Sequence, residues 1–517
     1  MNRGQRLPGQ GLIDESPLFE MACLVARARF GAKEADRVRA ILGAGEFDWS
    51  AFFAFVARHY VTPLANRNLG SLGSDVVPPK VLETLRVRAR INEWKAHRFA
   101  TELVRLNRLF ESHSIETIHY KGAVAGEQYY GAVALRTFGD LDFLLRRKDV
   151  VPMVRLLQSD GYVISGEFTP EQFNHFVAEF KEFLFRRGDF ALEPHWSVAG
   201  RRYPFDVPYE GLWERATMLR FDGAQVRVLG PEDAVLVLCL VGAKGRWKRL
   251  QMVTDVAECV RTFPKLDWAS VERTAKESGT LRILRLGLTL AESLVGATLP
   301  DSVARNLRDA AVDRLAADVV RAMIEPPPER RFLPDTPSIF SPLLFRQRER
   351  ASDRWSYFWH TTTTPSPLHM QRMPLPRWLS PLYRLLVPLH DYVAIPLGRL
   401  IKREIGGAES DDLVQSRSEQ RASEQAKPVA SRPKQSDTAV VQRMNDDVMV
   451  LERKSEVVHN LNVTAAWIFD QCDGQTDEQQ IVDRLMHEFS VDRDVAERDV
   501  AATLRELKAR GLVRLDV

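Results

Sequence analysis

Two aspartates one residue apart, Asp140 and Asp142, lie in the otherwise apolar segment 139–145. If this segment is a strand, side chains at positions i and i+2 point to the same face, so the two carboxylates project together. Converging carboxylates bind hard cations, and Mg²⁺ (or Mn²⁺) holding a nucleoside triphosphate is the usual case. The pair therefore predicts a metal site, whereas an isolated Asp-x-Asp motif is more often a solvated loop or a helix cap.

A third carboxylate, Glu193, lies in segment 190–196, which is expected to be the second strand of a hairpin. Three acids on neighbouring strands can bind two cations, which stabilise the entering and leaving oxygens of an in-line displacement. We expect Asp140 and Asp142 to be the shared ligands. Glu193 would hold the catalytic metal or accept the proton of the acceptor. His195 shares a face with Glu193, but it is interpreted as a packed, hydrogen-bonded histidine and not as a ligand.

Basic residues near the acids could hold a triphosphate. The expected turn at Gly122 opens a helix and would present backbone N–H groups and the positive end of the helix dipole to phosphate. Lys121 and Arg136 would add positive charge, or they could neutralise the acids in the folded core. Lys244 and Lys248 are expected one turn apart on one helix, where they would bind phosphates; a solvated helix face explains them as easily.

The chain around these residues alternates helical and extended patterns. Helical apolar spacing predicts helices, and short apolar runs between turn residues predict strands. The predicted helices are 52–60, 81–110, 123–130, 150–157 and several within 231–299, and the predicted strands are 117–120, 140–145, 181–187 and 190–196. This order predicts an α+β fold, in which a mixed sheet with helices forms a catalytic core embedded in helical modules.

The composition is that of a globular chain with several domains. A chain of 517 residues exceeds a single core, and 45% hydrophobic with 27% charged residues is ordinary for soluble proteins. The four cysteines lack Cys-x-x-Cys spacing, which disfavours a disulfide framework and a zinc site. The N-terminus lacks the apolar core of a signal peptide, and no apolar run is long enough to span a bilayer. We therefore expect a cytoplasmic protein without a membrane span.

Short motifs occur at Lys121-Gly122, Leu135-Arg136, Gly139-Asp140-Leu141-Asp142, Asp160-Gly161-Tyr162 and Glu193-Pro194-His195-Trp196. Together they resemble the uncharacterised nucleotidyltransferase family of the DNA polymerase β-like superfamily. The similarity extends to Asp48-Trp49, His59, 244–255, Asp267-Trp268 and Leu299-Pro300, and so covers most of residues 18–400. It implies metal-dependent transfer of a nucleoside monophosphate from an NTP, with ATP expected. Two departures are Lys121-Gly122 in place of the superfamily's Gly-Ser, and Val241 and Gly245 where the family pattern has histidines.

A polar segment, 406–438, separates this region from a C-terminal domain. It is almost free of aromatics and rich in Ser, Gln, Glu, Arg and Lys, which is typical of a flexible linker. The domain is expected to begin near Ala439 and to contain three helices, the second opened by a capping box of Thr476 and Gln479. The expected strands are 449–451, 457–461 and 512–515. These elements predict a small winged-helix-like unit.

The C-terminal domain is acidic. Residues 446–517 carry 16 acids and 9 bases, a net charge of −7 against +3 for the whole chain, which leaves +10 for the first 445 residues. Because phosphate neutralisation supplies much of the affinity for nucleic acids, DNA binding by this domain is not expected.

The segments 461–466, 472–476, 504–507 and 511–513 resemble the PqqD-like peptide-recognition family, and the match covers about residues 440–517. The resemblance implies that the leader of a ribosomally made precursor peptide adds as a strand to the small sheet. An acidic surface would suit a basic leader. A dimerisation or docking domain is the alternative interpretation.

The sequence predicts five segments: a helical N-terminal module (1–110), a nucleotidyltransferase core (111–200), its helical and irregular C-terminal part (201–405), the linker (406–438) and the PqqD-like domain (439–517). The first hypothesis is a nucleotidyltransferase that modifies a precursor peptide, with the linker raising the effective concentration of the bound peptide. A small metabolite, a sugar or a partner protein are other acceptors. The second hypothesis is a catalytically silent, nucleotide-binding adaptor that recruits a precursor peptide to a separate enzyme. A third, tRNA modification or a toxin–antitoxin function, rests only on the basic first 445 residues.

Overall fold

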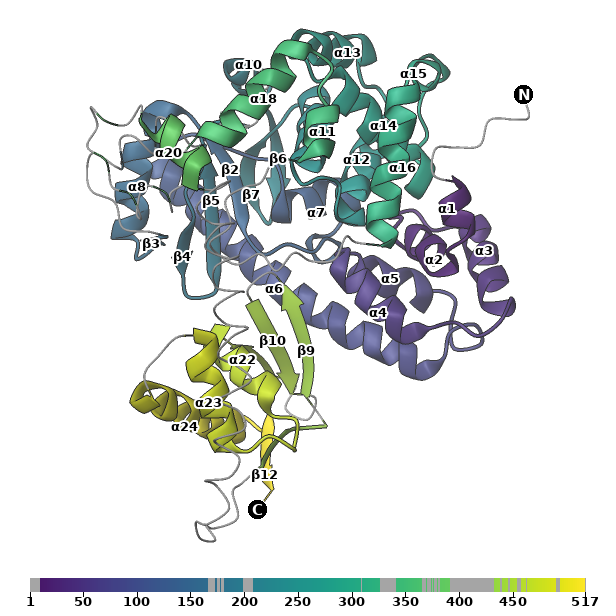
Figure 1. Cartoon of the computed structure of the whole chain (residues 1–517). Helices are drawn as coiled ribbons and strands as arrows, with labels where there is room; N and C mark the ends of the chain where they lie inside the picture. Colours follow the sequence, from purple (N-terminus) through teal and green to yellow (C-terminus); the bar gives the residue numbers. More distant parts are fainter. Residues whose placement is uncertain are drawn as a thin grey trace. The chain divides into compact units, whose positions relative to one another are not determined.

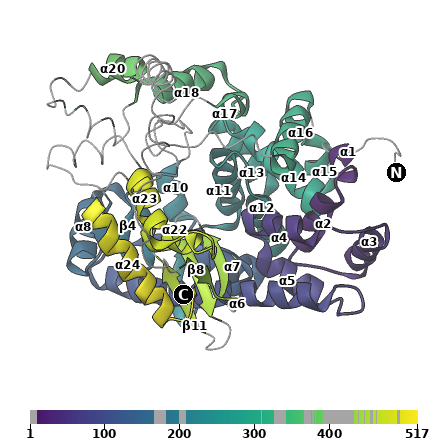
Figure 2. The same cartoon turned by 60° about the horizontal axis from the view of Figure 1, so that its bottom comes forward.

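The structure, a computed structural model, divides into two compact units, Met1–Ala394 and Ile395–Val517. Figures 1 and 2 show the chain from two directions. The structure describes residues 10–165, 173, 177, 181–198, 208–307, 309–325, 341–364, 369, 373, 375, 379, 382–390, 432–437, 439–444, 447–452, 457–461, 463–489 and 493–516.

In the described residues of the first unit, five short helices precede a long one. They are α1 (Gln10–Asp14), α2 (Pro17–Val25), α3 (Ala32–Gly43), α4 (Trp49–Arg58), α5 (Thr62–Gly70) and α6 (Pro79–Ser112). Side chains cap the start of two of them. The Ser16 hydroxyl accepts a hydrogen bond from the Phe19 N–H, and the Asp48 carboxylate accepts one from the Ala51 N–H. Each cap satisfies a backbone donor that has no partner within its own helix.

The long helix α6 belongs to two hydrophobic cores. Val81 and Leu85, near its start, pack in one core with buried residues of α2–α5. Phe99 and Phe110, further along, pack in a second core with the strands. Figure 1 shows α1–α5 gathered around one end of α6 and the sheet at the other end. This helix therefore fixes the sheet relative to the N-terminal helices.

A seven-stranded mixed sheet carries the candidate residues. Its strands are β1 (Thr117–His119), β2 (Leu141–Leu145), β3 (Val163–Ile164), β4 (Phe185–Arg187), β5 (Phe190–His195), β6 (Thr217–Phe221) and β7 (Ala224–Val228), in the order β3-β4-β5-β2-β1-β7-β6. β2 is antiparallel to β1 and parallel to β5, and β4 pairs with β5 as the predicted hairpin. Leu141 and Phe143 of β2 are buried in the core shared with α6. The predicted α+β fold and the strand at the aspartates are confirmed.

Helices complete the first unit. They are α7 (Gly122–Tyr130), α8 (Val150–Ser159), α10 (Tyr209–Glu214), α11 (Pro231–Lys244), α12 (Leu250–Thr262), α13 (Trp268–Glu277), α14 (Leu281–Val295), α15 (Asp301–Asn306), α16 (Ala310–Ile324), α17 (Pro342–Arg346), α18 (Ala351–Thr363) and α20 (Tyr383–Leu389), with 3₁₀ turns at Val133–Leu135 and Arg147–Asp149. The predicted helical stretch within 231–299 corresponds to α11–α14. Within the described part of the chain, every helix is too short or too polar to cross a lipid bilayer.

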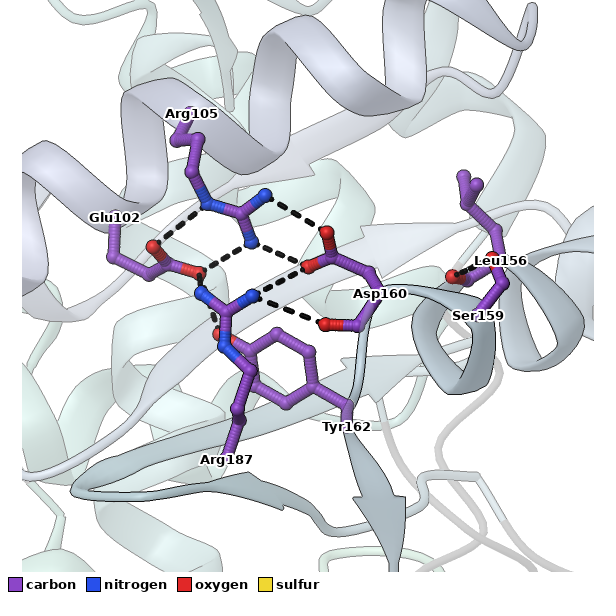
Figure 3. Close-up of polar contacts among 7 residues, drawn as sticks. All are labelled: Glu102, Arg105, Leu156, Ser159, Asp160, Tyr162 and Arg187. Carbon is purple, nitrogen blue, oxygen red and sulfur yellow. Dashed lines mark hydrogen bonds and ion pairs between the residues drawn. The ribbon is translucent and has the colours of Figure 1, made fainter.

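A network of charged residues joins α6 to the sheet edge that carries β4 (Figure 3). The buried Glu102 carboxylate accepts hydrogen bonds from Arg105, from Arg187 of β4 and from the Tyr162 hydroxyl, at 2.7, 2.8 and 2.6 Å. Asp160, just after α8, contacts both guanidinium groups, at 3.0 Å from Arg105 and 2.9 Å from Arg187. The network holds the β4–β5 hairpin against α6, and thereby the strand that carries Glu193.

The turn between α11 and α12 is fixed by a buried indole. The ring of Trp247 lies against two helical glycines, and a Cβ added at Gly242 would stand 2.3 Å from it. A Cβ at Gly287 of α14 would stand 2.9 Å from the same ring and 2.6 Å from Cys239 Sγ. Both glycines are therefore required by close packing, and they fix the end of α11, where Lys244 lies.

Replacing Gly242 with alanine is expected to destabilise the first unit by about 2–3 kcal/mol, because the added methyl group overlaps the Trp247 ring in a tightly packed core. Urea denaturation followed by circular dichroism measures the change. Gly43→Ala is the matched control, since Gly43 is the last residue of α3 and nothing lies within 4 Å of its Cβ position. Equal effects of the two substitutions would contradict this account of the Gly242 site.

A buried histidine caps the start of α12. The Leu250 N–H donates to His59 Nδ1 at 3.0 Å, and the Gln251 N–H donates to the His59 carbonyl oxygen at 3.2 Å. Burial, together with the positive charges of Arg58 and Arg249, lowers the pKa of His59 to about 3. The imidazole is therefore neutral in the fold, with Nδ1 available as an acceptor.

Stability is expected to fall as the pH drops below the ordinary histidine pKa of about 6.5, because the unfolded chain then protonates His59 and the folded chain does not. The contribution of His59 to the free energy of unfolding is complete above pH 6.5 and is lost progressively toward pH 3. Between pH 8 and pH 5 the loss amounts to about 2 kcal/mol. His59→Asn keeps an acceptor oxygen near the Nδ1 position and does not titrate. Denaturation at several pH values should therefore give a flatter stability profile for this variant; identical profiles would contradict the assignment.

The described residues of the second unit form two small sheets and three helices. One sheet has the order β11-β10-β9, formed by β9 (Ala439–Met444), β10 (Asp447–Glu452) and β11 (Val457–Leu461), and the other pairs β12 (Val513–Asp516) with β8 (Arg432–Gln435). The helices are α22 (Val463–Gln471), α23 (Glu478–Phe489) and α24 (Arg493–Ala509). Phe469, Leu485 and Leu504 share one core. The three predicted strands and three helices are present; the winged-helix comparison stays a prediction.

Two expectations for this unit need correction. Residues 432–435, placed in the linker, form β8 and pair with β12. The rest of the predicted linker, 406–431, lies outside the described residues. The capping box of α23 is formed by Asp477 and Gln480, whose side chains accept each other's backbone N–H at 2.8 and 3.0 Å. The predicted Thr476 and Gln479 pair is one residue early, and Thr476 instead donates to Asp473.

Candidate functional site

The parallel pairing of β2 and β5 brings the candidate acids together. In this register Asp142 pairs with Glu193, and Leu144 pairs with His195. Asp142 is buried, with a side chain 5% exposed, while the Glu193 side chain is 31% exposed. His195 Nε2 lies 2.9 Å from Asp142 Oδ1 and 3.7 Å from Glu193 Oε2. The structure therefore brings two predicted acids together with a histidine that was interpreted as packing only.

The chemistry of the donor atoms fits a divalent cation. One ligand atom from each of Asp142, Glu193 and His195 lies within 4.8 Å of the other two, so one ion could reach all three. Carboxylate oxygens favour Mg²⁺ or Mn²⁺, and an imidazole nitrogen is also accepted by Mn²⁺ and later transition metals. Burial, followed by the charges of Lys181 and Lys121, lowers the pKa of His195 to about 3 against the opposing effect of Asp142. A neutral imidazole is the form that binds metals.

Asp140 lies just before β2, next to the turn that opens α7. Burial first, and then the negative charges of Asp142 and Glu193, raise the pKa of Asp140 to about 7. Gly122 has a φ of 60°, and its Cβ position would be 3.3 Å from the Asp140 carbonyl oxygen. Only glycine fits this backbone without strain. The predicted helix start at Gly122 is present, and the turn lets the start of α7 approach the acidic strand.

Lys121 contacts Asp142, a buried acid of the candidate site. Its Nζ lies 2.9 Å from Asp142 Oδ1. Burial disfavours charge on both groups, but their mutual attraction raises the pKa of Lys121 and, together with His195, lowers that of Asp142. Lys121 therefore neutralises Asp142, which is the second of the two roles considered from the sequence.

Arg136 has a different partner from either expected one. Its Nε and Nη2 donate to the Asp255 carboxylate of α12, at 2.9 and 2.8 Å, and the Tyr130 hydroxyl donates to the same carboxylate at 2.6 Å. All three side chains are in the buried interior. Arg136 thus ties the loop before β2 to α12. These hydrogen bonds go to Asp255 and not to Asp140 or Asp142, and the assignment of Arg136 to the nucleotide stays a prediction.

Lys244 and Lys248 do not share a helix, contrary to expectation. α11 ends at Lys244, and Arg246 and Trp247 have positive φ values in the turn before α12. The helix cannot continue through such a turn. Lys244 reaches the site, with Nζ 3.7 Å from Glu182 Oε2. Lys248 is exposed in the turn, and its assignment to phosphates stays a prediction.

Lys181 and Glu182, in the segment before β4, complete the cluster. They were not predicted as site residues from the sequence. Glu182 Oε2 lies 2.7 Å from His195 Nδ1, and Lys181 Nζ lies 3.1 Å from the same nitrogen. Burial and the neighbouring Lys244 lower the pKa of Lys181. The predicted hairpin was the available signal, since it places 181–187 beside the strand of Glu193 and His195, but neither residue belonged to a motif.

The chain matches two family models. Residues 45–296 match the model described as uncharacterised nucleotidyltransferase, and residues 447–513 match the model described as coenzyme PQQ synthesis protein D (PqqD). Both resemblances inferred from the sequence are confirmed: the chain carries a nucleotidyltransferase-family segment followed by a PqqD-family segment. Asp140, Asp142, Glu193 and His195 all lie within the first match.

Comparison with solved structures gives an antigenic nucleotidyltransferase-like protein from Paracoccidioides brasiliensis, at 16% identity, covering 40% of this chain and 96% of that one, with a TM-score of 0.25. At this TM-score the similarity carries no argument. The comparison with curated proteins found no match.

Proposed function

We propose that the chain is a metal-dependent nucleotidyltransferase, which moves a nucleoside monophosphate from an NTP to an acceptor. The observation that supports this most strongly is the β2–β5 register, because it places the Asp142 and Glu193 carboxylates side by side with His195 in a segment that matches a nucleotidyltransferase family. The expected NTP is ATP and the expected metal is Mg²⁺ or Mn²⁺.

Each residue has a task in this proposal. Asp142, Glu193 and His195 hold the divalent cation, and the nearby Asp140 adds a further carboxylate. Bound there, the cation would neutralise charge on the phosphates and on the leaving diphosphate. Glu193 is partly exposed and is the candidate to accept the proton of the acceptor. Lys244 and the N–H groups at Gly122 are the candidate phosphate contacts.

The acceptor is proposed to be a ribosomally made precursor peptide bound by the PqqD-family segment. Among the strands that the structure describes, β9 pairs only with β10 and lies at the edge of its sheet. An edge strand offers unpaired backbone groups to which a peptide can add as a further strand. The net charge of −7 over residues 446–517 favours a basic leader. The linker predicted from composition would keep the bound peptide at a high effective concentration.

The test uses NTPs labelled at the α or the γ phosphate, with Mg²⁺, the full chain, and native cell extract or candidate leader peptides as acceptors. Transfer of α label by the wild type, and its loss in the Asp140→Ala/Asp142→Ala double variant, are expected. Transfer of γ label would make the protein a kinase and reject the proposal.

One observation favours the alternative, a catalytically silent adaptor. The Lys121 ammonium group contacts the carboxylate of the central candidate ligand, Asp142, and Lys121-Gly122 replaces the superfamily's Gly-Ser. An adaptor would bind nucleotide without turnover and keep this binding in Asp140→Ala. Residues 432–517 alone, which include β8 and β12, would then bind the precursor peptide with high affinity.

A further inference from the structure

The carboxylate of Glu182 lies among cationic and hydrogen-bonding groups beside the acidic cluster. Its Oε2 is 2.7 Å from His195 Nδ1 and 3.7 Å from Lys244 Nζ, and it also forms an ion pair with the adjacent Lys181. One anionic oxygen thus meets three partners from three places in the fold: the segment before β4, the end of β5 and the end of α11.

The surroundings of the two lysines favour an anion at this point. The Lys181 side chain is 9% exposed and the Lys244 side chain 34% exposed, so water screens Lys181 poorly. A third ammonium group, on Lys121, lies nearby on Asp142. Like charges brought together in a poorly solvated place destabilise one another, and the Glu182 carboxylate offsets this repulsion.

A phosphate group would satisfy these cations better than one carboxylate oxygen does. It offers several strongly accepting oxygens and more negative charge, so it could contact Lys181 and Lys244 through different oxygens. Oε2 is buried in this arrangement, but the Glu182 side chain as a whole is 33% exposed, so rotation of the side chain can move the carboxylate into water. His195 connects the position to Asp142, where the proposed function places the metal.

We propose that Glu182 is an exchangeable internal anion: the phosphate chain of the incoming nucleoside triphosphate displaces its carboxylate from Lys181 and Lys244. This inference rests on the proposed function, because it assigns the vacated position to the phosphates of the transferred nucleotide. Lys181 then joins Lys244 as a phosphate contact. Glu182 competes with the nucleotide and so weakens the binding of free phosphate chains.

Calorimetric titration of the full chain with inorganic tripolyphosphate, in buffer containing a chelator, tests the exchange. Glu182→Gln keeps the size of the side chain and removes the competing charge, so it is expected to bind tripolyphosphate about tenfold more tightly than the wild type. Asp189→Asn is the matched control: it removes the same charge from the tip of the β4–β5 hairpin, where Asp189 pairs with Arg98. It should change the affinity less than about twofold.

Unchanged or weaker binding by Glu182→Gln would overturn the inference. An equal gain in both variants would overturn it as well, because net charge alone would then explain the effect. Lys181→Gln provides a second reading and should weaken binding about tenfold; no loss would reject Lys181 as a phosphate contact. Circular dichroism confirms folding of each variant.

The outcome can be separated from that of the proposed function, since tripolyphosphate has no nucleoside to transfer. Tighter binding by Glu182→Gln without any transfer of α label would support the anion exchange and reject the transferase. Transfer of α label without tighter binding would reject the exchange alone.

Discussion

Replacing Asp142 with asparagine is expected to lower Mn²⁺ affinity by at least about a hundredfold and nucleotidyl transfer by about a thousandfold. Asparagine keeps the shape of the side chain but removes the charge of Asp142, the buried carboxylate that forms the candidate metal site together with Glu193 and His195. Changes to groups that only support metal ligands already cost about 10–100-fold, and a metal supplies several kcal/mol of charge stabilisation to the transition state. Metal titration and initial rates of α-label transfer measure the two effects.

Asp189→Asn is the control for the Asp142 variant, because it makes the same chemical change outside the cluster. It should keep metal affinity and rate within about twofold of the wild type. An Asp142→Asn protein that retains transfer within about threefold would contradict the assignment of the site. Loss of rate in both variants would point to a general defect in folding.

Breaking the pair between Arg136 and Asp255 is expected to have the largest effect on stability. Arg136→Met leaves the Asp255 carboxylate buried with only the Tyr130 hydroxyl as a donor, since both guanidinium contacts, at 2.9 and 2.8 Å, are removed. Removing one partner of a buried ion pair typically costs about 3–5 kcal/mol, because the other charge stays buried without compensation. Urea denaturation of the first unit, followed by circular dichroism, measures the loss.

The double variant Arg136→Met/Asp255→Leu should recover part of this stability, because no uncompensated charge remains. Arg39→Met is the matched control, since Arg39 pairs with Asp36 on an exposed helix face. It should cost less than about 1 kcal/mol. A small loss in Arg136→Met, similar to that of the control, would show that the buried pair does not hold the loop before β2 in place.

The elements around the site were predictable because their signals are local. The alternation around Asp140 and Asp142 indicated a buried strand, and the short apolar runs 181–187 and 190–196 indicated the hairpin that carries Glu193. These elements allowed Asp142 and Glu193 to be neighbours but did not determine it. The parallel pairing of β2 with β5, which makes them neighbours, depends on contacts across the whole sheet.

The contacts that were missed join residues far apart in the chain. Arg136 finds Asp255 across 119 positions, and no local pattern distinguishes that pair from a phosphate contact. Lys181 and Glu182 can be recognised as part of the site only in the folded structure, where Lys244, at the end of α11, lies beside them.

The remaining errors concern the bounds of single elements. The Gly242–Trp247 packing ends α11 before Lys248, although the charges continue at helical spacing. β8 has a polar sequence, so its composition placed it in the linker. Its partner strand, β12, comes about 80 residues later in the chain, and no local signal indicates that the two strands pair. Asp477 and Gln480 make the capping box that Thr476 and Gln479 would make one residue earlier.

The most direct test of the proposed transferase site is pulsed electron paramagnetic resonance of Mn²⁺ bound to the full chain with a non-hydrolysable NTP analogue. The account predicts ³¹P coupling from the phosphates together with ¹⁴N coupling from the His195 imidazole in the wild type and in Asp189→Asn, which shows that phosphate and protein hold the same ion. The ¹⁴N coupling should disappear in Asp142→Asn at the same metal and nucleotide concentrations, where the remaining ³¹P coupling is that of the free metal–nucleotide complex. Absence of ¹⁴N coupling in the wild type, or equal ¹⁴N coupling in Asp142→Asn, would contradict the central claim.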